Sequence, residues 1–225
     1  MVIKVLRNLR YLKFKIFDSK RYKNLVLEKF KDLNILVLEE TFNPTLYFAT
    51  EFFIDSIINF IKKDSKVLDL GTGTGVIGIS CAKKNAKVVC ADINEEAIRS
   101  AKINSLLNKT EKNINFKVSN LFENLKSEKF DFILFNPPYY KGKPEDLHDF
   151  SWRAGENFET FVNFLDEFKF YLNENGKAFI VISTNSKLPE ILNDFKEKIS
   201  ITLISQKNLV TEKLLVYELE ELKNV

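Results

Sequence analysis

The sequence contains few of the residues that hold metal ions or form disulfide frameworks. It has two cysteines, Cys81 and Cys90, and a single histidine, His148. The cysteines do not form a Cys-x-x-Cys pair, so their spacing argues against a zinc site and against a disulfide scaffold. We therefore expect no bound metal. Two isolated thiols are typical of proteins in a reducing compartment, which predicts a cytoplasmic location.

Long apolar runs are also missing from the sequence. No run reaches the roughly 18 apolar residues that indicate a transmembrane helix, so we expect no contact with a membrane. The N-terminus is basic but lacks the unbroken apolar segment of a secretory signal. The chain has 225 residues, of which 45% are hydrophobic and 29% charged, as expected for one globular domain with a small appendage.

Positive charge is concentrated at the N-terminus. Residues 1–31 hold ten Lys or Arg and two acids, a net charge of +8, which leaves −5 on the rest of a chain whose total is +3. A basic arm on an acidic body favours contact with a polyanion such as RNA or a ribosome-related partner. The alternative is a solvated helix face whose apolar residues, Ile3, Leu6, Leu9 and Leu12, pack on the body. Both interpretations remain open, and the oligomeric state is not predicted.

The hydrophobic pattern predicts an α/β fold. Apolar runs at 24–28 and 34–39 indicate a β-hairpin in a basic N-terminal extension, residues 1–49. From residue 50 to residue 225 helices and strands alternate, with Thr50 as the expected N-cap of the first helix. The predicted strands span 66–70, 87–91, 114–118, 130–135, 177–182, 201–205 and 213–219. We expect a doubly wound, Rossmann-like, seven-stranded and mostly parallel sheet with an antiparallel hairpin at its C-terminal edge.

A glycine-rich loop follows the first strand of this domain. The residues Gly71, Thr72, Gly73 and Gly75 stand between a strand and a helix, where glycines allow a tight turn and close approach of a ligand. Asp92 ends the next strand, where a carboxylate can accept hydrogen bonds from both hydroxyls of a ribose. The loop and the acid together predict a site for an adenosine-containing cofactor.

Two cofactor classes fit the glycine loop. Read from Gly73, the loop matches the Gly-x-Gly-x-x-Gly fingerprint of nicotinamide-dependent dehydrogenases. Read from Gly71 it is Gly-x-Gly-x-Gly, with Asp69 two residues earlier. An acid beside the loop would repel a pyrophosphate but could meet the cationic amino group of a methionine moiety. The sequence therefore favours a methyl donor over a dinucleotide.

The fourth strand runs into Asn136-Pro137-Pro138-Tyr139. This segment resembles the [N/D]-P-P-[Y/F/W] motif of the amino-methyltransferases, and the resemblance covers residues 42–219. It implies that S-adenosyl-L-methionine is the cofactor and that Asn136 also borders it. The Asn136 side-chain oxygen and the Pro137 carbonyl would hold the two N–H groups of a planar nitrogen, while Tyr139 stacks on the target. No titrating base is needed before transfer.

The resemblance extends to further cofactor and target residues. Ile93 is expected to cover one face of the adenine and Leu121 to bind the cofactor, and Asn120 stands where relatives usually carry an acid that accepts from the adenine amine. Residues near Asn43-Pro44 and the loop after the motif resemble the HemK/PrmC-type glutamine methyltransferases of the small-domain type. The expected target-binding residues are Pro138, Tyr140, Trp152, Arg153 and Tyr47.

The sequence leaves the target open. A glutamine amide of a release factor or another translation protein is the expectation from the HemK/PrmC resemblance. An adenine or guanine amine in rRNA or tRNA is the alternative, and the basic N-terminus favours it. DNA is disfavoured, because a chain of 225 residues has no room for a separate target-recognition domain. A nicotinamide-dependent oxidoreductase and a silent binding domain remain as distant alternatives, in which Asn136 would have no role.

Overall fold

A computed structural model gives the fold of residues 25–39, 41–146 and 149–222. The predictions for the basic arm, for its apolar residues Ile3 to Leu12 and for His148 lie outside these described ranges. Among the described helices, none has the length and apolar character that crossing a membrane requires.

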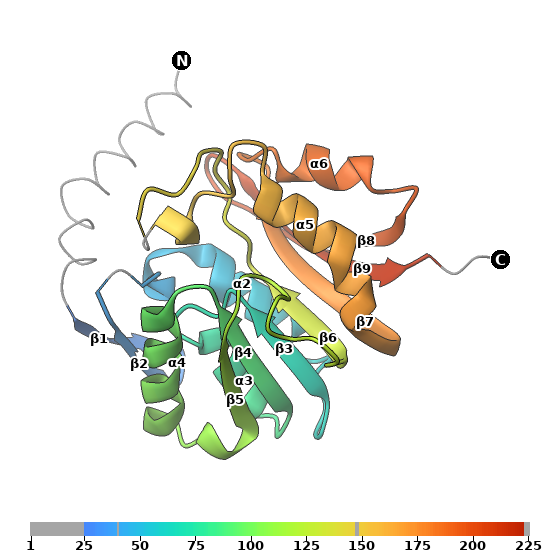
Figure 1. Cartoon of the computed structure of the whole chain (residues 1–225). Coiled ribbons are helices and arrows are strands. Elements are labelled where there is room, and N and C mark those ends of the chain that lie inside the picture. The colour runs from blue at the N-terminus through green and yellow to red at the C-terminus, as the bar shows by residue number, and fades with distance from the viewer. Residues whose placement is uncertain (1–24, 40, 147–148, 223–225) are drawn as a thin grey trace.

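A seven-stranded sheet forms the centre of the protein (Figure 1). Its strands are β3 (Lys66–Leu70), β4 (Lys87–Asp92), β5 (Ile114–Val118), β6 (Phe130–Phe135), β7 (Leu172–Ser183), β8 (Ile199–Asn208) and β9 (Lys213–Glu221). They lie in the order β5-β4-β3-β6-β7-β9-β8, and the first five are parallel. β9 is antiparallel to both β7 and β8. The expected mostly parallel sheet with an antiparallel edge hairpin is therefore confirmed.

The strand order reverses next to β3. The chain builds β3, β4 and β5 outward in one direction, then returns to place β6 on the other side of β3. In open α/β sheets, ligands bind outside the carboxyl ends of the strands at such a switch point. This topology brings the segments after β3, β4, β5 and β6 to one edge of the sheet.

Helices cover both faces of the sheet. They are α2 (Phe48–Ile57), α3 (Val76–Ala82), α4 (Glu95–Leu107), α5 (Glu159–Glu167) and α6 (Leu188–Asp194). Side chains alternate along a strand, so Val67 packs with α2 and α3, whereas Leu68 packs with α5 and α6 on the opposite face. α4 packs against α3, β4 and β5.

The predicted N-terminal hairpin is present. β1 (Val26–Phe30) and β2 (Leu33–Val37) pair antiparallel, and β2 packs on α4 (Figure 1). The inward residues Phe30, Leu33 and Ile35 belong to the same apolar cluster as α2 and α3. The hairpin thus shares the core of the main domain, and the boundary between residues 49 and 50 stays a prediction.

The expectation that Thr50 caps a helix is wrong. α2 begins at Phe48, and its N-cap residue is Tyr47, which makes no side-chain cap bond. The reason is a short 3₁₀ helix, η2 (Pro44–Leu46), which leads almost directly into α2. Asn43 caps η2 by accepting from the Thr45 amide at 3.0 Å. Thr50 therefore lies inside the first turn, where its hydroxyl is available to the neighbouring site.

Candidate active site

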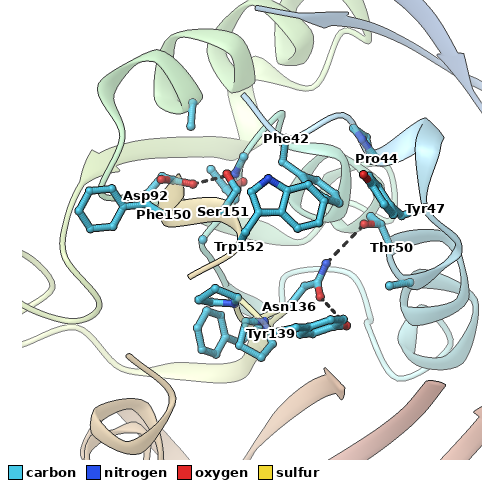
Figure 2. A pocket seen from close by; sticks show the side chains of 18 of the residues that line it. Phe42, Pro44, Tyr47, Thr50, Asp92, Asn136, Tyr139, Phe150, Ser151 and Trp152 are labelled. Carbon is cyan, nitrogen blue, oxygen red and sulfur yellow. Dashed lines mark hydrogen bonds between the residues drawn. The ribbon is translucent and has the colours of Figure 1, made fainter. Parts of the chain in front are cut away.

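A cavity of about 1100 Å³ opens at the carboxyl ends of β3, β4, β5 and β6. Sites for single small molecules usually measure about 300–1,000 Å³, so this cavity has room for two reactants. Its wall includes the segments that follow those four strands, the chain from Thr41 to Thr50, and part of the turn between β8 and β9. The sequence motifs, far apart along the chain, thus meet in one space (Figure 2).

The glycine loop, residues 71–75, forms one end of the cavity. Gly71, Gly73 and Gly75 have φ angles of +65°, +53° and +85°, a left-handed conformation that side chains rarely adopt. At Gly75 a Cβ atom would also lie 2.9 Å from the Cβ of Ala101 on α4. Gly71, Thr72 and Gly73 line the cavity, whereas Gly75 is the N-cap of α3 and does not.

Asp69 supports the glycine loop from behind. It is fully buried, and its Oδ2 accepts from the Thr72 hydroxyl at 2.5 Å and from the Gly78 amide at 2.8 Å. It does not line the cavity, because it shares the strand face of Val67, which packs toward α3. In this position Asp69 supports the loop, and its expected contact with a cofactor stays a prediction. Burial raises the pKa of Asp69 to about 7, against the opposing effect of these two hydrogen bonds.

Asp92 lies where β4 ends and lines the cavity beside the loop (Figure 2). Its Oδ2 accepts from the Gly73 amide and its Oδ1 from the Asn94 amide, both at 2.9 Å. Each carboxylate oxygen has two lone pairs, so each has one left to accept from a hydroxyl. Burial raises the pKa of Asp92, and the bonds from Asn94 and Gly73 oppose that shift. This donor and acceptor pattern fits a ribose.

Ile93, Asn120 and Leu121 also line this half of the cavity, and their contact with a cofactor stays a prediction. The Asn120 Nδ2 donates to Glu123 Oε1 at 3.0 Å, and the amide oxygen can still accept a hydrogen bond from a guest. Leu121 has a φ angle of +45°, and its carbonyl accepts from the Ser119 hydroxyl at 2.8 Å.

Asn136 lies in the middle of the cavity wall, directly after β6 (Figure 2). Its Oδ1 accepts from the Tyr139 hydroxyl at 3.0 Å, and its Nδ2 lies 3.5 Å from the Thr50 hydroxyl. The first distance is an ordinary hydrogen bond and the second is at the outer limit. The side chain is therefore oriented mainly by Tyr139, with one lone pair of Oδ1 left for a guest.

Tyr139 has a role that the sequence did not predict. Its ring packs against the core on the α5 side of the sheet, and its hydroxyl also lies 3.2 Å from the Val181 carbonyl on β7. Burial raises the pKa of Tyr139 above its ordinary value, so the phenol keeps the proton that it donates. The motif thus carries its own positioning residue for Asn136, while the expected stacking on a target stays a prediction.

An aromatic cluster, defined as Phe42, Tyr47 and Trp152, lies over the cavity (Figure 2). Phe42 stacks on Tyr47 with a centroid distance of 5.3 Å, and Trp152 meets their rings edge-on at 5.3 and 5.0 Å. Trp152 comes from the loop after the Asn136 motif, which folds back on itself. The Tyr140 amide donates to the Trp152 carbonyl at 2.8 Å, and the Ala154 amide to the Tyr140 carbonyl at 2.8 Å.

The other expected target residues also line the cavity. Pro137, Pro138, Tyr140 and Arg153 are part of its wall, and the Arg153 Nε lies 2.9 Å from an oxygen of Asp149. The cavity therefore combines the predicted cofactor residues with the predicted target residues, apart from Asp69 and Gly75, which support the glycine loop.

Several cavity residues were missed from the sequence. Phe42 carried no motif, and the residues from the C-terminal half have no sequence signal at all: Asn185, Leu209, Thr211, Glu212 and Leu214. Asn185 reaches the cavity because it follows the carboxyl end of β7. The other four come with β9, which inserts beside β7 and brings the preceding turn with it. The Ser183 hydroxyl donates to Glu212, which fixes this acid near Tyr139. Within the described ranges no group of three or more His, Cys, Asp and Glu is placed to hold a metal ion.

The chain is similar in sequence to known methyltransferases. The family model described as "Methyltransferase small domain" matches residues 45–212. A putative protein N5-glutamine methyltransferase of Methanocaldococcus jannaschii is 38% identical over 161 residues, which are 68% of this chain and 80% of that protein. A release factor glutamine methyltransferase of Flavobacterium psychrophilum is 33% identical over 151 residues, covering 65% of this chain and about half, 52%, of that protein.

Solved structures share the fold at lower identity. The T. thermophilus 16S rRNA N2 G1207 methyltransferase in complex with AdoMet and guanosine superposes with a TM-score of 0.63 at 18% identity. The match covers 87% of this chain and 50% of that one. At this identity the likeness concerns the fold alone.

Proposed function

Because this chain belongs to the methyltransferase small domain family, we propose that it transfers a methyl group from S-adenosyl-L-methionine to the side-chain amide nitrogen of a glutamine in a protein. A release factor is the protein that the similar Flavobacterium enzyme is named for, and we propose a protein of this class as the target. The observation that carries the proposal is the Asn136 amide, held by Tyr139 in a cavity that it shares with the glycine loop.

The glycine loop and Asp92 would hold the cofactor. Gly71 to Gly73 present backbone to the cavity, and the two Asp92 oxygens are placed to accept from a ribose diol. Ile93 and Leu121 supply apolar surface and Asn120 an acceptor for an adenine. S-adenosyl-L-methionine, when bound, would supply the methyl group: its S–CH3 bond breaks as the nitrogen lone pair forms the N–CH3 bond, S-adenosylhomocysteine leaves, and the methylated nitrogen loses one proton.

Asn136 and Pro137 would orient the target nitrogen. An amide nitrogen is a weak nucleophile, because its lone pair is delocalised into the carbonyl. Two acceptors, Asn136 Oδ1 and the Pro137 carbonyl, match the two N–H groups of a primary amide and leave the lone pair as the free direction. Tyr139 keeps Asn136 Oδ1 facing the guest, so the protein contributes mainly by positioning.

The similar proteins favour a protein target over RNA. The charge of the cavity wall does not decide between them, because the wall holds the acids Glu212 and Asp149 but also Lys141 and Arg153, and Arg153 is paired with Asp149. Both similar proteins named above act, by name, on glutamine, whereas the rRNA enzyme shares only the fold. An exocyclic base amine has the same two N–H groups, so RNA is kept as an outcome of the test.

The test uses radiolabelled S-adenosylmethionine with a cell extract and with a purified release factor. We expect protein-bound label that protease releases and ribonuclease does not. Replacing the acceptor glutamine of the release factor by glutamate removes the amide nitrogen and should abolish labelling. Label released by ribonuclease would overturn the protein target and leave RNA as the substrate.

A variant of the protein tests the mechanism separately. Asn136→Ala should abolish transfer while S-adenosylhomocysteine still binds, since Asn136 holds the target and the glycine loop is untouched. Near-normal turnover of this variant would contradict the mechanism. Loss of S-adenosylhomocysteine binding would instead mean that Asn136 serves the cofactor half of the cavity.

A further inference from the structure

Asn104 joins three parts of the protein that are distant in sequence. It lies on α4 and is completely buried. Its Nδ2 donates to the Leu36 carbonyl on β2 and to the Thr74 carbonyl in the glycine loop, both at 2.9 Å. Its Oδ1 accepts from the Leu36 amide at 2.6 Å. Both N–H groups of the amide thus donate hydrogen bonds, and one of these bonds goes to the glycine loop in the cofactor half of the cavity.

Asn108, one helical turn further, makes a similar contact with the hairpin but none with the glycine loop, and its Nδ2 also donates to the Asn104 carbonyl at 2.8 Å. Its Oδ1 accepts from the Asn34 amide at 3.2 Å, and its Nδ2 donates to the Asn34 carbonyl at 2.8 Å. Four residues of helix rise about 6 Å, and two residues of strand rise about 6.8 Å. The side-chain amides of Asn104 and Asn108 therefore take the place of a neighbouring strand beside β2. They pair with the backbone N–H and C=O groups of Leu36 and Asn34, which would otherwise lie unpaired at its outer edge.

The end of the hairpin leads into the cavity wall. After β2, the Thr41 hydroxyl donates to the Leu38 carbonyl at 2.7 Å, and Thr41 and Phe42 then line the cavity. The Phe42 Cβ lies 4.0 Å from where a Cβ of Gly73 would be, so Phe42 lies close to the glycine loop. A short segment thus joins the hairpin to Phe42 of the aromatic cluster, next to the glycine loop.

The glycine loop is held on its other side by the same helix. A Cβ at Gly75 would lie 2.9 Å from Ala101, three residues before Asn104. Thr74 is 2% exposed and its carbonyl has Asn104 as its partner, so a shift of the loop moves that carbonyl relative to the hairpin. A molecule that holds the loop in place therefore also stabilises the hydrogen bonds between Asn104 and Leu36.

We infer that Asn104 is a positioning residue that couples the N-terminal hairpin to cofactor binding at the glycine loop. The inference rests on the proposed function, because it takes the glycine loop as the cofactor site. Coupling between two sites is reciprocal, so cofactor binding stabilises the docked hairpin as much as the docked hairpin strengthens cofactor binding. The hairpin is then part of the cofactor site, although it contributes no contact of its own to the cavity.

The first measurement uses the unaltered protein and hydrogen exchange. S-adenosylhomocysteine should slow amide exchange in peptides covering 33–38 as well as in those covering 71–75. If S-adenosylhomocysteine slows amide exchange at 71–75 but leaves it unchanged at 33–38, the coupling is wrong. This measurement does not depend on any variant folding correctly.

The second measurement compares two variants by calorimetric titration with S-adenosylhomocysteine. Asn104→Ala loses the bond to Thr74 and should bind about tenfold more weakly, as expected for one buried hydrogen bond and a less ordered loop. Asn108→Ala loosens the same hairpin but leaves the Thr74 contact, so its affinity should stay within about threefold. In Asn104→Ala the cofactor should no longer slow exchange at 33–38.

The outcomes separate this inference from the proposed function. Unaltered protein that does not bind S-adenosylhomocysteine would overturn both. Unaltered protein that binds it, together with an Asn104→Ala variant of equal affinity and equal hairpin protection, would overturn the coupling alone. Equal weakening in Asn104→Ala and Asn108→Ala would show that the hairpin acts by general destabilisation, which also contradicts a specific role for Asn104.

Discussion

Replacing Tyr139 by Phe isolates the bond that orients Asn136. The ring stays and fills the same space in the core, while the hydroxyl that donates to Asn136 Oδ1 at 3.0 Å is lost. The remaining contact of the Asn136 side chain, 3.5 Å to Thr50, is too long to hold the amide in one orientation. The variant should therefore fold and bind the cofactor but present a poorly oriented acceptor to the target.

The size of the effect follows from the bond that is removed. A neutral hydrogen bond contributes about 1 kcal/mol net, which corresponds to about a fivefold change in rate. The cofactor affinity should not change, because the hydroxyl contacts neither the glycine loop nor Asp92. We expect kcat to fall about five- to tenfold, with the Kd for S-adenosylhomocysteine within about twofold of the unaltered protein.

The pH dependence distinguishes positioning from acid–base catalysis. Burial raises the pKa of Tyr139, so its hydroxyl keeps its proton across the usual assay range. The ratio of the two rates should then be constant between about pH 6 and pH 9. Steady-state assays with labelled cofactor measure this ratio. Full turnover of Tyr139→Phe, or a ratio that changes with pH, would refute the positioning role.

Two further predictions concern the cofactor half of the cavity. Asp92→Ala should weaken S-adenosylhomocysteine binding about tenfold or more in calorimetry, since charge-assisted hydrogen bonds contribute about 1.5–3 kcal/mol, and an unchanged affinity would contradict the ribose contact. Asp69, with its pKa raised to about 7, binds a proton in the folded state that the unfolded chain releases above about pH 4, so it lowers stability as pH rises from about 4 to 7. Asp69→Asn should flatten that part of the thermal unfolding profile, and an unchanged slope would contradict the assignment.

Much of the fold was predictable because its signals are local. The parallel strands β3, β4, β5 and β6 coincide with the predicted apolar runs, whereas β7 begins at Leu172, five residues before its predicted start. The glycine loop and the Asn136 motif each follow directly from a strand. The carboxyl ends of neighbouring parallel strands meet at one edge, so the motifs had to come together. The switch point between β3 and β6 makes the same edge the place of the cavity.

Several of the contacts that the sequence did not predict join segments that lie far apart along the chain. The bonds from Thr72 and Gly78 to Asp69 were not predicted: the alternation of side chains along β3 turns this acid toward α3, and its contact with the cofactor stays a prediction. Glu212 and Asn185 carry no motif: the insertion of β9 beside β7 brings Glu212 to the cavity, whereas Asn185 follows the carboxyl end of β7. The Asn104 contacts join segments 30 and 68 residues away, a relation that no local pattern expresses.

The aromatic cluster has a practical consequence. Trp152 is the single tryptophan of the chain, and it lies in the cavity wall in contact with Phe42 and Tyr47. Emission excited at the indole band therefore comes from one place, between the N-terminal segment and the loop after the Asn136 motif. Trp152 fluorescence therefore serves as an intrinsic probe of the cavity, and stopped-flow fluorescence can follow the binding of each reactant without an attached dye.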